Sequence, residues 1–166
     1  MPERGADTAR LEFRAIELPR DAALCVAFRR DSFVCSFGSD ARFFEQDDAR
    51  GSAYLEWLAG RIARFPEGHV HVWRGATIIG QIEMIAGRES GYVNLFYLVP
   101  EARGQGLGAA LHAYAVELFQ RHGVTRANLR VSPSNEQALR YYARHGWKDL
   151  GRPPGEEGVL LMELQL

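Results

Sequence analysis

The fold of this chain follows from one stretch of its sequence, Gly91-Tyr-Val-Asn-Leu-Phe-Tyr-Leu-Val-Pro-Glu-Ala-Arg-Gly-Gln-Gly-Leu-Gly108. Its apolar and aromatic run from Tyr92 to Val99 is typical of a strand that is covered on both faces. Pro100 ends the strand because proline has no N–H for the ladder. Three alternate glycines then lead into apolar residues at helical spacing from Ala109 to His122. The sequence therefore predicts a central strand, a glycine turn and a helix.

The glycine turn has the form of an anion-binding site. A helix start presents unpaired N–H groups and the positive end of the helix dipole, and residues without a Cβ let a phosphate approach them. The alternative is a purely structural turn in which the glycines supply only backbone angles. A P-loop is unsupported, because it requires Gly-Lys-Ser/Thr where Leu107-Gly108-Ala109 stands. A dinucleotide-binding motif fits Gly104-x-Gly106-x-x-Ala109 as written, but the next strand, 127–131, ends in Ser132-Pro-Ser-Asn135 rather than in the expected acid.

A second block of residues narrows these alternatives. The first block is Arg103-x-x-Gly106-x-Gly108, and the second is Asn135-x-x-Ala138-x-x-Tyr141-Tyr142-x-Arg144-x-Gly146-Trp147. In order and separation the two blocks resemble the acetyl-CoA-binding motifs of the GNAT superfamily of N-acyltransferases. They extend from about Tyr92 to Trp147, and the pair is far more specific than either block alone.

The composition is that of an ordinary globular protein, with 46% hydrophobic and 25% charged residues among 166. A net charge of −1 argues against a general nucleic-acid binder. No run approaches the ~18 apolar residues of a membrane span, and residues 1–10 lack the apolar core of a signal peptide, so a cytoplasmic protein without membrane contact is expected. Cys25 and Cys35 lack metal or redox spacing. His69 and His71 share one face of a predicted strand without an evident third ligand, so no metal site is predicted.

Hydrophobic periodicity predicts the remaining elements. Strands are expected at 11–18, 69–73, 77–85, 127–131, 147–150 and 159–166. Helices are expected from Asp21 to about 33–38, around 54–65, and from about Asn135 to His145 after the capping-box sequence Ser134-Asn135-Glu136-Gln137, whereas 40–52 is expected to be irregular. The strands before and after the glycine-turn helix should be parallel.

The order of these elements matches the GNAT fold. The fold class expected is α/β (α+β), with a central mixed, mostly antiparallel sheet of about six to seven strands and about four helices. We expect a single domain over residues 1–166, with its acetyl-CoA-binding core at about 91–147.

The resemblance implies acetyl-CoA as cosubstrate, with no metal. The pyrophosphate would lie on backbone N–H groups of the glycine turn, and the pantetheine arm would enter where the strand splays from its neighbour. Asn135 would bond the pantetheine, and Arg144 would meet the adenosine end unless it is only a surface charge. The residues expected to bind the cofactor are Leu98, Val99, Arg103, Gly104, Gln105, Gly106, Leu107, Gly108, Ala109, Asn135, Tyr142 and Arg144.

Acylation of an amine needs a base for the ammonium proton, a donor for the oxyanion and an acid for the leaving thiolate. By resemblance, Tyr142 is the acid, with a half-buried packing role as its alternative, and the backbone N–H of Leu98 is the oxyanion donor. Glu83 lies in an otherwise apolar strand and is the candidate base if it faces the cleft, because burial raises a carboxyl pKa. A solvent-facing carboxylate is the alternative. Asn94 can orient a water but cannot take the proton.

The expected function is acetyl transfer from acetyl-CoA to a primary amine, in a ternary complex and with a small molecule as acceptor. The segment from Asp31 to Glu56 contains six acidic residues and two arginines. This excess of acids indicates a cationic acceptor, or it is simply the composition of a solvated loop. Acetylation of protein N-termini or lysines and a non-catalytic acyl-CoA sensor remain alternatives. The resemblance also allows a homodimer.

Overall fold

The computed structural model describes residues 10–166, which form a seven-stranded sheet in the order β1-β2-β3-β4-β5-β7-β6. β4 (Ser90–Leu98) lies in the middle of this sheet, as predicted. β4 and β5 are parallel, as expected from the helix that connects them, and the other neighbours are antiparallel. The remaining strands are β1 (Leu11–Ala15), β2 (His69–Arg74), β3 (Thr77–Ala86), β5 (Arg126–Val131), β6 (Lys148–Asp149) and β7 (Leu160–Gln165).

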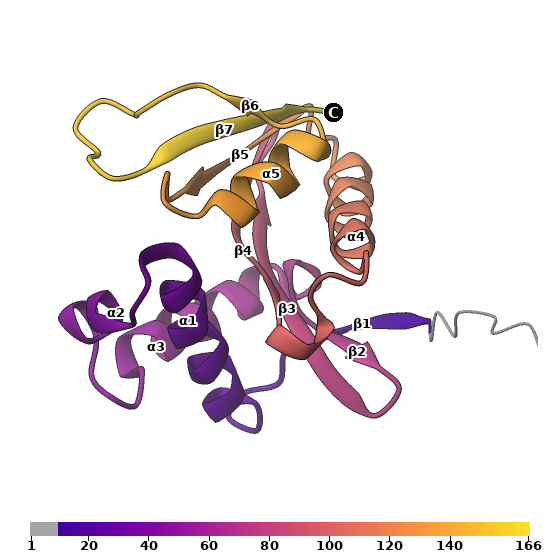
Figure 1. Cartoon of the computed structure of the whole chain (residues 1–166). Helices are drawn as coiled ribbons and strands as arrows, with labels where there is room; N and C mark the ends of the chain where they lie inside the picture. Colours follow the sequence, from indigo (N-terminus) through magenta and orange to yellow (C-terminus); the bar gives the residue numbers. More distant parts are fainter. Residues whose placement is uncertain (1–9) are drawn as a thin grey trace, which may run out of the picture.

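Helices cover both sides of the central strands. Figure 1 shows α1, α2 and α3 grouped on one side of β3 and β4, and α4 on the other. The α-helices of the described chain are α1 (Ala22–Phe37), α2 (Ala41–Gln46), α3 (Ser52–Arg64), α4 (Gly108–Arg121) and α5 (Glu136–Arg144), with short 3-10 turns η1 (Pro66–Gly68) and η2 (Pro100–Ala102).

The helix α2 was not predicted, since its segment was expected to be irregular. It is six residues long, which is too short to display a helical period. Phe43 is 1% exposed and anchors it in a hydrophobic cluster with Tyr54 and Leu58. Tertiary packing, rather than a local pattern, therefore forms this helix.

Two other predictions were wrong at the ends of elements. The capping box was expected to begin at Ser134, but the N-cap of α5 is Asn135, whose Oδ1 accepts a hydrogen bond from the Ala138 N–H at 3.2 Å. Ser134 instead donates its hydroxyl to the carbonyl of Ser36 in α1. The first strand ends at Ala15, three residues before the predicted end at Leu18.

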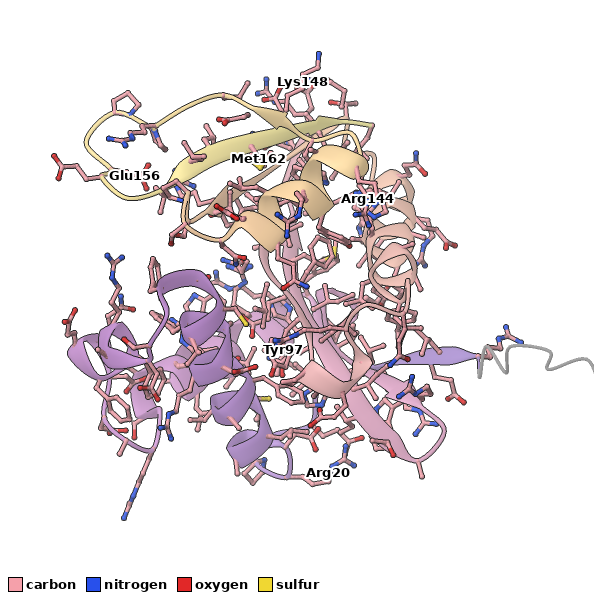
Figure 2. The ribbon with its side chains drawn as sticks, in the orientation of Figure 1. Arg20, Tyr97, Arg144, Lys148, Glu156 and Met162 are labelled. Atoms are coloured by element: carbon pink, nitrogen blue, oxygen red, sulfur yellow. The ribbon has the colours of Figure 1, made fainter. Side chains whose placement is uncertain are left out.

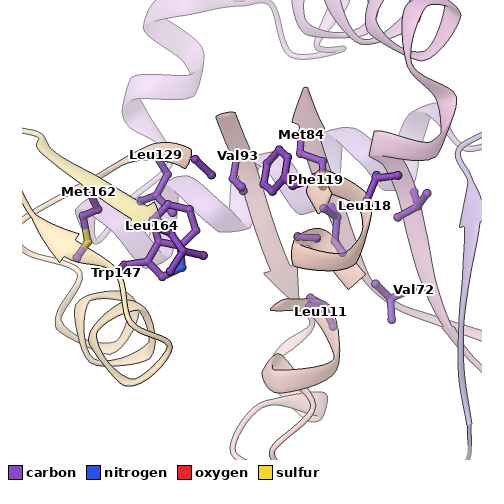
Figure 3. Packing of buried hydrophobic residues seen from close by; sticks show 14 of the residues in the cluster. Val72, Met84, Val93, Leu111, Leu118, Phe119, Leu129, Trp147, Met162 and Leu164 are labelled. Carbon is purple, nitrogen blue, oxygen red and sulfur yellow. The ribbon is translucent and has the colours of Figure 1, made fainter. Parts of the chain in front are cut away.

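The main hydrophobic core lies between the sheet and α4. Val72, Met84, Val93, Leu118 and Phe119 belong to it, and Figure 3 shows these side chains packed together with Leu111, Leu129 and Trp147. A second cluster lies beneath α1, α2 and α3. No helix within residues 10–166 is long and apolar enough to cross a bilayer.

The strand face beneath α1 and α3 carries buried polar side chains. His69, His71, Gln81 and Glu83, which we call the polar layer, are each 1% exposed or less. His69 pairs with Glu83 and His71 with Gln81 across β2 and β3. Because side chains alternate along a strand, the intervening valines of β2 reach the main core instead. Buried polar groups require partners, so this layer positions a hydrogen-bonded network at the centre of the molecule.

Candidate active site

β4 contains a bulge at the point where it separates from β5. Glu83 pairs with Leu95 and Met84 pairs with Val93, so Asn94 is the extra residue on β4. The parallel pairing with β5 ends at Val93 and Leu129, although β4 continues to Leu98 and β5 to Val131. Figure 1 shows β5 turning away from β4. The two strands therefore leave an open edge of β4 between them.

A cleft of about 330 Å³ occupies this opening. It is lined by residues 93–98 of β4, by Ser32 and Ser36 of α1, and by Asn135, Ala138, Tyr141 and Tyr142. The Val99 N–H donates to the Ile79 carbonyl of β3 at 2.8 Å. Since backbone groups alternate in direction along an antiparallel pair, the N–H of Leu98 points away from β3 and toward the cleft.

The direction of the backbone N–H groups distinguishes Leu98 from Val99, both of which were expected to bind the cofactor. Leu98 offers its N–H on the open edge. The Val99 N–H is engaged with β3, and the Val99 carbonyl accepts from Ala102 at 2.9 Å. The N–H of Val99 is therefore already paired with β3, whereas the N–H of Leu98 remains available to a ligand.

The glycine turn is open and rich in unpaired donors. Gly104 and Gly106 have φ of 73° and 77°, and a Cβ on either would meet no atom within 4 Å. In the described part of the chain, no acceptor binds the N–H groups of residues 104–108. Unpaired N–H groups at the start of the 14-residue α4 fit a phosphate. The Arg103 N–H lies outside this set, because it donates to the Pro100 carbonyl at 3.2 Å at the end of η2.

The side chain of Arg103 ties the turn to α1. Its Nε donates to the Leu98 carbonyl and its Nη2 donates to Oδ2 of Asp31, each at 2.9 Å. The Tyr97 hydroxyl donates to the same Asp31 oxygen at 2.5 Å. Figure 2 shows Tyr97 beside α1. Asp31 therefore connects α1 to β4 and to the residue that precedes the glycine turn.

The two neighbouring tyrosines of α5 have different surroundings. The Tyr141 hydroxyl donates to the Gly108 carbonyl at 2.6 Å and so supports the glycine turn. Tyr142 packs against Phe96 and Trp147, with ring centroids 6.5 and 5.8 Å apart, and its hydroxyl bonds to no described residue. Burial raises the pKa of Tyr142, so its phenol keeps its proton at neutral pH. Tyr142 thus presents an available proton in the cleft.

The other two residues expected to bind the cofactor on α5 differ in place. Asn135 lines the cleft, and its Oδ1 is used as the helix cap. Arg144 is exposed at the last residue of α5, and it lies outside the residues that line the cleft (Figure 2). The structure therefore brings Asn135 and Tyr142 together in the cleft, but not Arg144.

Two further pockets lie beneath α1, α2 and α3. The inner pocket, about 200 Å³, is lined by Arg29, Ser32, Phe33, Ser36, Phe37, Glu83, Asn94 and Leu95. The outer pocket, about 320 Å³, is lined by Arg29, Phe43, Gln46, Asp47, Ala53, Tyr54, Trp57 and Asn94. Asn94 also lines the cleft, so the bulge residue is common to all three spaces.

Glu83 lies at the wall of the inner pocket. The Tyr54 hydroxyl and the Gln81 amide donate to its Oε2 at 2.5 and 2.7 Å, and no described residue binds its Oε1. Burial raises the pKa of Glu83, although the two hydrogen bonds oppose that shift. A carboxyl with one fixed oxygen, one open oxygen and a raised pKa suits a general base. Glu83 thus faces a pocket rather than bulk solvent.

The histidines of the polar layer have separate partners. His71 Nε2 lies 2.8 Å from Oε1 of Gln81 and donates to it, which leaves the Gln81 amide N–H groups for Tyr54 and Glu83. His69 donates from Nδ1 to the Phe65 carbonyl at 2.9 Å. Burial lowers the pKa of both histidines. Among residues 10–166, no group of three His, Cys, Asp or Glu side chains is placed to hold a metal ion.

Sequence reasoning missed Arg29 and Tyr54 as site residues. Tyr54 was assigned only to a helix core, and Arg29 belongs to the predicted first helix without a local motif. Tyr54 and Glu83 are 29 residues apart, so no spacing rule connects them. The apolar residues at helical spacing that predicted the second helix, Tyr54 among them, gave the signal for this pocket wall.

A comparison with known families places these features. A model described as the acetyltransferase (GNAT) family matches residues 28–147. A mycothiol acetyltransferase of Acidimicrobium ferrooxidans is 32% identical over 88 residues, which are 53% of this chain and 25% of that protein. A mycothiol acetyltransferase of Streptomyces bingchenggensis is 31% identical over 114 residues, 66% of this chain and 37% of that protein. The matched part of the chain therefore spans only 25% and 37% of the length of these two curated relatives.

Solved structures share the fold over nearly the whole chain. PaiA N-acetyltransferase from Thermoplasma acidophilum, in complex with coenzyme A, has a TM-score of 0.79 at 20% identity, covering 94% of this chain and 99% of that one. Spermidine N-acetyltransferase from Vibrio cholerae, in complex with CoA and spermine, has a TM-score of 0.70 at 19% identity, covering 93% and 95%. At these identities the similarity concerns the fold alone.

Proposed function

The chain belongs to the GNAT acetyltransferase family, and we propose that it transfers an acetyl group from acetyl-CoA to the primary amine of a small molecule. The observation that supports this best is the junction at Asn94. There the open edge of β4, the cleft with Tyr142 and the inner pocket with Glu83 meet. An acyl donor and an amine acceptor would reach each other at this point from opposite sides.

In this proposal the cleft and the glycine turn hold acetyl-CoA. The pyrophosphate lies on the N–H groups of Gly104 to Gly108, with Ala109 beginning the helical hydrogen bonds at 3.4 Å. The pantetheine arm follows the open edge of β4 toward Leu98, with Asn135 on the opposite wall. Arg103 acts through its side chain, by holding the Leu98 carbonyl and Asp31, rather than through its N–H.

The proposed chemistry is direct attack of the amine on the thioester carbon. The acceptor ammonium first loses a proton to Oε1 of Glu83 or to a water beside it, since only the neutral amine has a lone pair. The N–C bond forms while the Leu98 N–H donates to the developing oxyanion. The C–S bond then breaks and the Tyr142 phenol gives its proton to the thiolate. The nitrogen, which became positively charged on attack, releases one further proton to water, so that the product amide keeps one N–H. Tyr142 regains a proton from solvent and Glu83 releases the one it took up, so atoms and charge balance.

The acceptor is proposed to be small because the inner and outer pockets are small. Their volumes, about 200 and 320 Å³, are at or below the lower end for ligand pockets. Acetylation of protein N-termini or lysines is the alternative, since both pockets are open to the surface beneath α1 to α3. The single-domain organisation of residues 1–166, the core at 91–147 and a homodimer also remain proposals.

Two measurements test the proposed function. Thermal unfolding is measured with acetyl-CoA, CoA and NAD, since a ligand at about 100 times its dissociation constant adds ~2.7 kcal/mol of stability. A shift with both CoA species but not with NAD supports the cofactor. Thiol release is then followed over a panel of spermidine, mycothiol-related amines, free amino acids, dipeptides and lysine peptides. Binding of acetyl-CoA without turnover of any acceptor would favour an acyl-CoA sensor instead.

A further inference from the structure

The inner and outer pockets, which we call the acceptor pockets, share a cationic side chain, Arg29. It projects from α1 and lines both the inner and the outer pocket. Its guanidinium carbon lies 4.6 Å from the centroid of the Tyr54 ring and 5.3 Å from that of Phe33. Stacking on aromatic rings fixes the plane of a guanidinium while its N–H edges remain able to donate. Within residues 10–166, no carboxylate forms an ion pair with Arg29.

Asn94 supplies a second donor beside Arg29. Its Oδ1 accepts a hydrogen bond from Nη2 of Arg61 at 2.6 Å, which orients the amide and leaves its Nδ2 as a donor. Asn94 lines the same two pockets as Arg29. The two side chains therefore offer several N–H groups to a single ligand.

The acidic groups nearby are mostly occupied by the chain itself. Asp47 lines the outer pocket, but its Oδ1 accepts from the N–H of Ala53 and its Oδ2 from that of Tyr54. Asp40 is paired with Arg30 at 2.8 Å, and Asp31 with Arg103 at 2.9 Å. Of the acids between Asp31 and Glu56, only Asp47 lines the inner or outer pocket, and both of its oxygens already accept backbone N–H groups.

Glu83 is the remaining carboxyl that lines the described pockets. The inner pocket thus combines one carboxyl that can accept an ammonium proton with one guanidinium and one amide that donate. This arrangement fits a ligand with one amine and one anion close together. It does not fit a polyamine, whose second ammonium would lie near Arg29.

We propose that the acceptor is an amine that carries a carboxylate, such as a free amino acid, and that Arg29 and the Asn94 amide bind this carboxylate while the amino group faces Glu83. This inference rests on the proposed acetyltransferase function and names its substrate class. Aromatic side chains of Phe43, Tyr54 and Trp57 line the outer pocket and would receive an apolar substituent of the amino acid.

The test compares acceptors that differ only in the carboxylate. We would measure kcat/KM for phenylalanine, phenylalaninamide and phenethylamine, with spermidine as the polyamine and an ω-amino acid to locate the carboxylate relative to the amine. The expected result is that phenylalanine exceeds its amide and phenethylamine by at least about 10-fold, because a hydrogen bond to a charged carboxylate is stronger than one to a neutral amide. Equal values for the three compounds, or a preference for spermidine, would overturn the inference.

Variants assign the preference to Arg29. Arg29→Met should abolish the advantage of phenylalanine over its amide, whereas Arg29→Lys should retain part of it. Arg30→Met is the matched control, because Arg30 follows Arg29 on α1 but pairs with Asp40 and lies outside the residues that line the pockets. The control should keep the wild-type ratio. The wild-type ratio decides the question by itself if Arg29→Met does not fold.

A binding measurement separates this inference from the proposed function. If the protein binds CoA but acetylates no amine, calorimetry of phenylalanine and its amide with the CoA complex replaces kinetics. Carboxylate-dependent binding that is lost in Arg29→Met would support the site, although the enzyme proposal would fail. Turnover of amines without any dependence on a carboxylate would support the enzyme proposal and refute the site.

Discussion

The hydroxyl of Tyr54 lies 2.5 Å from Oε2 of Glu83, and this contact joins α3 to the middle of β3. Gln81 donates to the same oxygen at 2.7 Å. Both bonds favour the charged form of a carboxyl whose burial favours the neutral form. The two hydrogen bonds therefore lower the pH above which Glu83 is ionised and able to accept a proton.

Removing the Tyr54 hydroxyl should shift the pH dependence of catalysis. In Tyr54→Phe, Glu83 loses a hydrogen bond that stabilises its charged form, so its raised pKa rises further. We expect the acidic limb of kcat/KM to move to higher pH, measured over about pH 5 to 9. Glu83→Gln should remove that limb. An unchanged limb in both variants would exclude Glu83 as the base and leave a water relay.

The two tyrosines of α5 should give different kinetic defects. Tyr142→Phe removes the proposed acid and should lower kcat about 100-fold, with little change in the thermal shift caused by CoA. Tyr141→Phe removes the bond to the Gly108 carbonyl, so it should weaken CoA binding more than turnover at saturation. Initial rates at saturating and limiting acetyl-CoA distinguish the two effects. If Tyr142→Phe retained the wild-type kcat, its role would be packing against Phe96 and Trp147.

Gly106→Ala should weaken CoA binding through the open side of the turn. Gly106 has φ of 77°, so alanine there costs about 1–2 kcal/mol of stability. Its Cβ would also occupy the open space in which a phosphate approaches the N–H groups. Gly75→Ala is the control, since Gly75 has φ of 62° and equally open surroundings in the turn between β2 and β3.

Both variants should lose similar amounts of thermal stability, but only Gly106→Ala should lose CoA affinity, by about 10-fold or ~1.4 kcal/mol. Calorimetric titration with CoA measures this difference. Equal CoA affinities in the two variants would mean that the glycines serve the turn alone.

The protein should lose stability in mild acid partly because of His112. Its Nε2 accepts from the indole N–H of Trp147 at 3.0 Å, and burial, followed by the nearby His145, lowers its pKa from 6.5 to about 4. Between these pH values the unfolded chain binds a proton that the folded chain does not, so stability falls as pH falls from 6.5 to 4. His112 should contribute about 1–2 kcal/mol to this loss.

Denaturant unfolding at pH 7 and pH 5 checks this expectation. His112→Gln keeps an acceptor for Trp147 but cannot take up the proton, so its stability should differ less between the two pH values than that of the wild type. An identical pH dependence in the two proteins would contradict the role of His112.

Local signals in the sequence were sufficient to predict the elements that form the cleft and the glycine turn. The buried strand, the glycine turn and the α4 pattern are contiguous, and the helix between β4 and β5 requires the two strands to be parallel. Tyr142 and Asn135 follow from a motif of fixed spacing on α5. The hydrogen bonds that occupy the N–H groups of Val99 and Arg103 could not be predicted from the sequence, because strand register and the 3-10 turn η2 determine the direction of these groups.

The two pockets beneath α1 to α3 depend on packing between distant segments. The alternation of His69, Val70, His71 and Val72 is typical of a strand with one solvated face, but α1 and α3 cover that face and bury the polar layer. The bulge at Asn94 is a single extra residue, which leaves no period or composition signal. The sequence between Asp31 and Glu56 predicted an acidic net charge, but it did not predict the partners of these acids. Asp47 accepts backbone N–H groups, and Asp40 and Asp31 pair with arginines.

In the proposed acetyltransferase, the carboxylate of Asp31 would connect the acceptor pockets to the glycine turn. Asp31 belongs to the helix that covers the acceptor pockets, yet it is held by Tyr97 and by the arginine that precedes the cofactor turn. A ligand that orders the turn would thereby favour one position of α1. By thermodynamic linkage, the acceptor would then tighten acetyl-CoA binding by the same factor that acetyl-CoA tightens acceptor binding. The expected kinetic consequence is synergy, in which the KM for each of the two ligands falls as the concentration of the other rises.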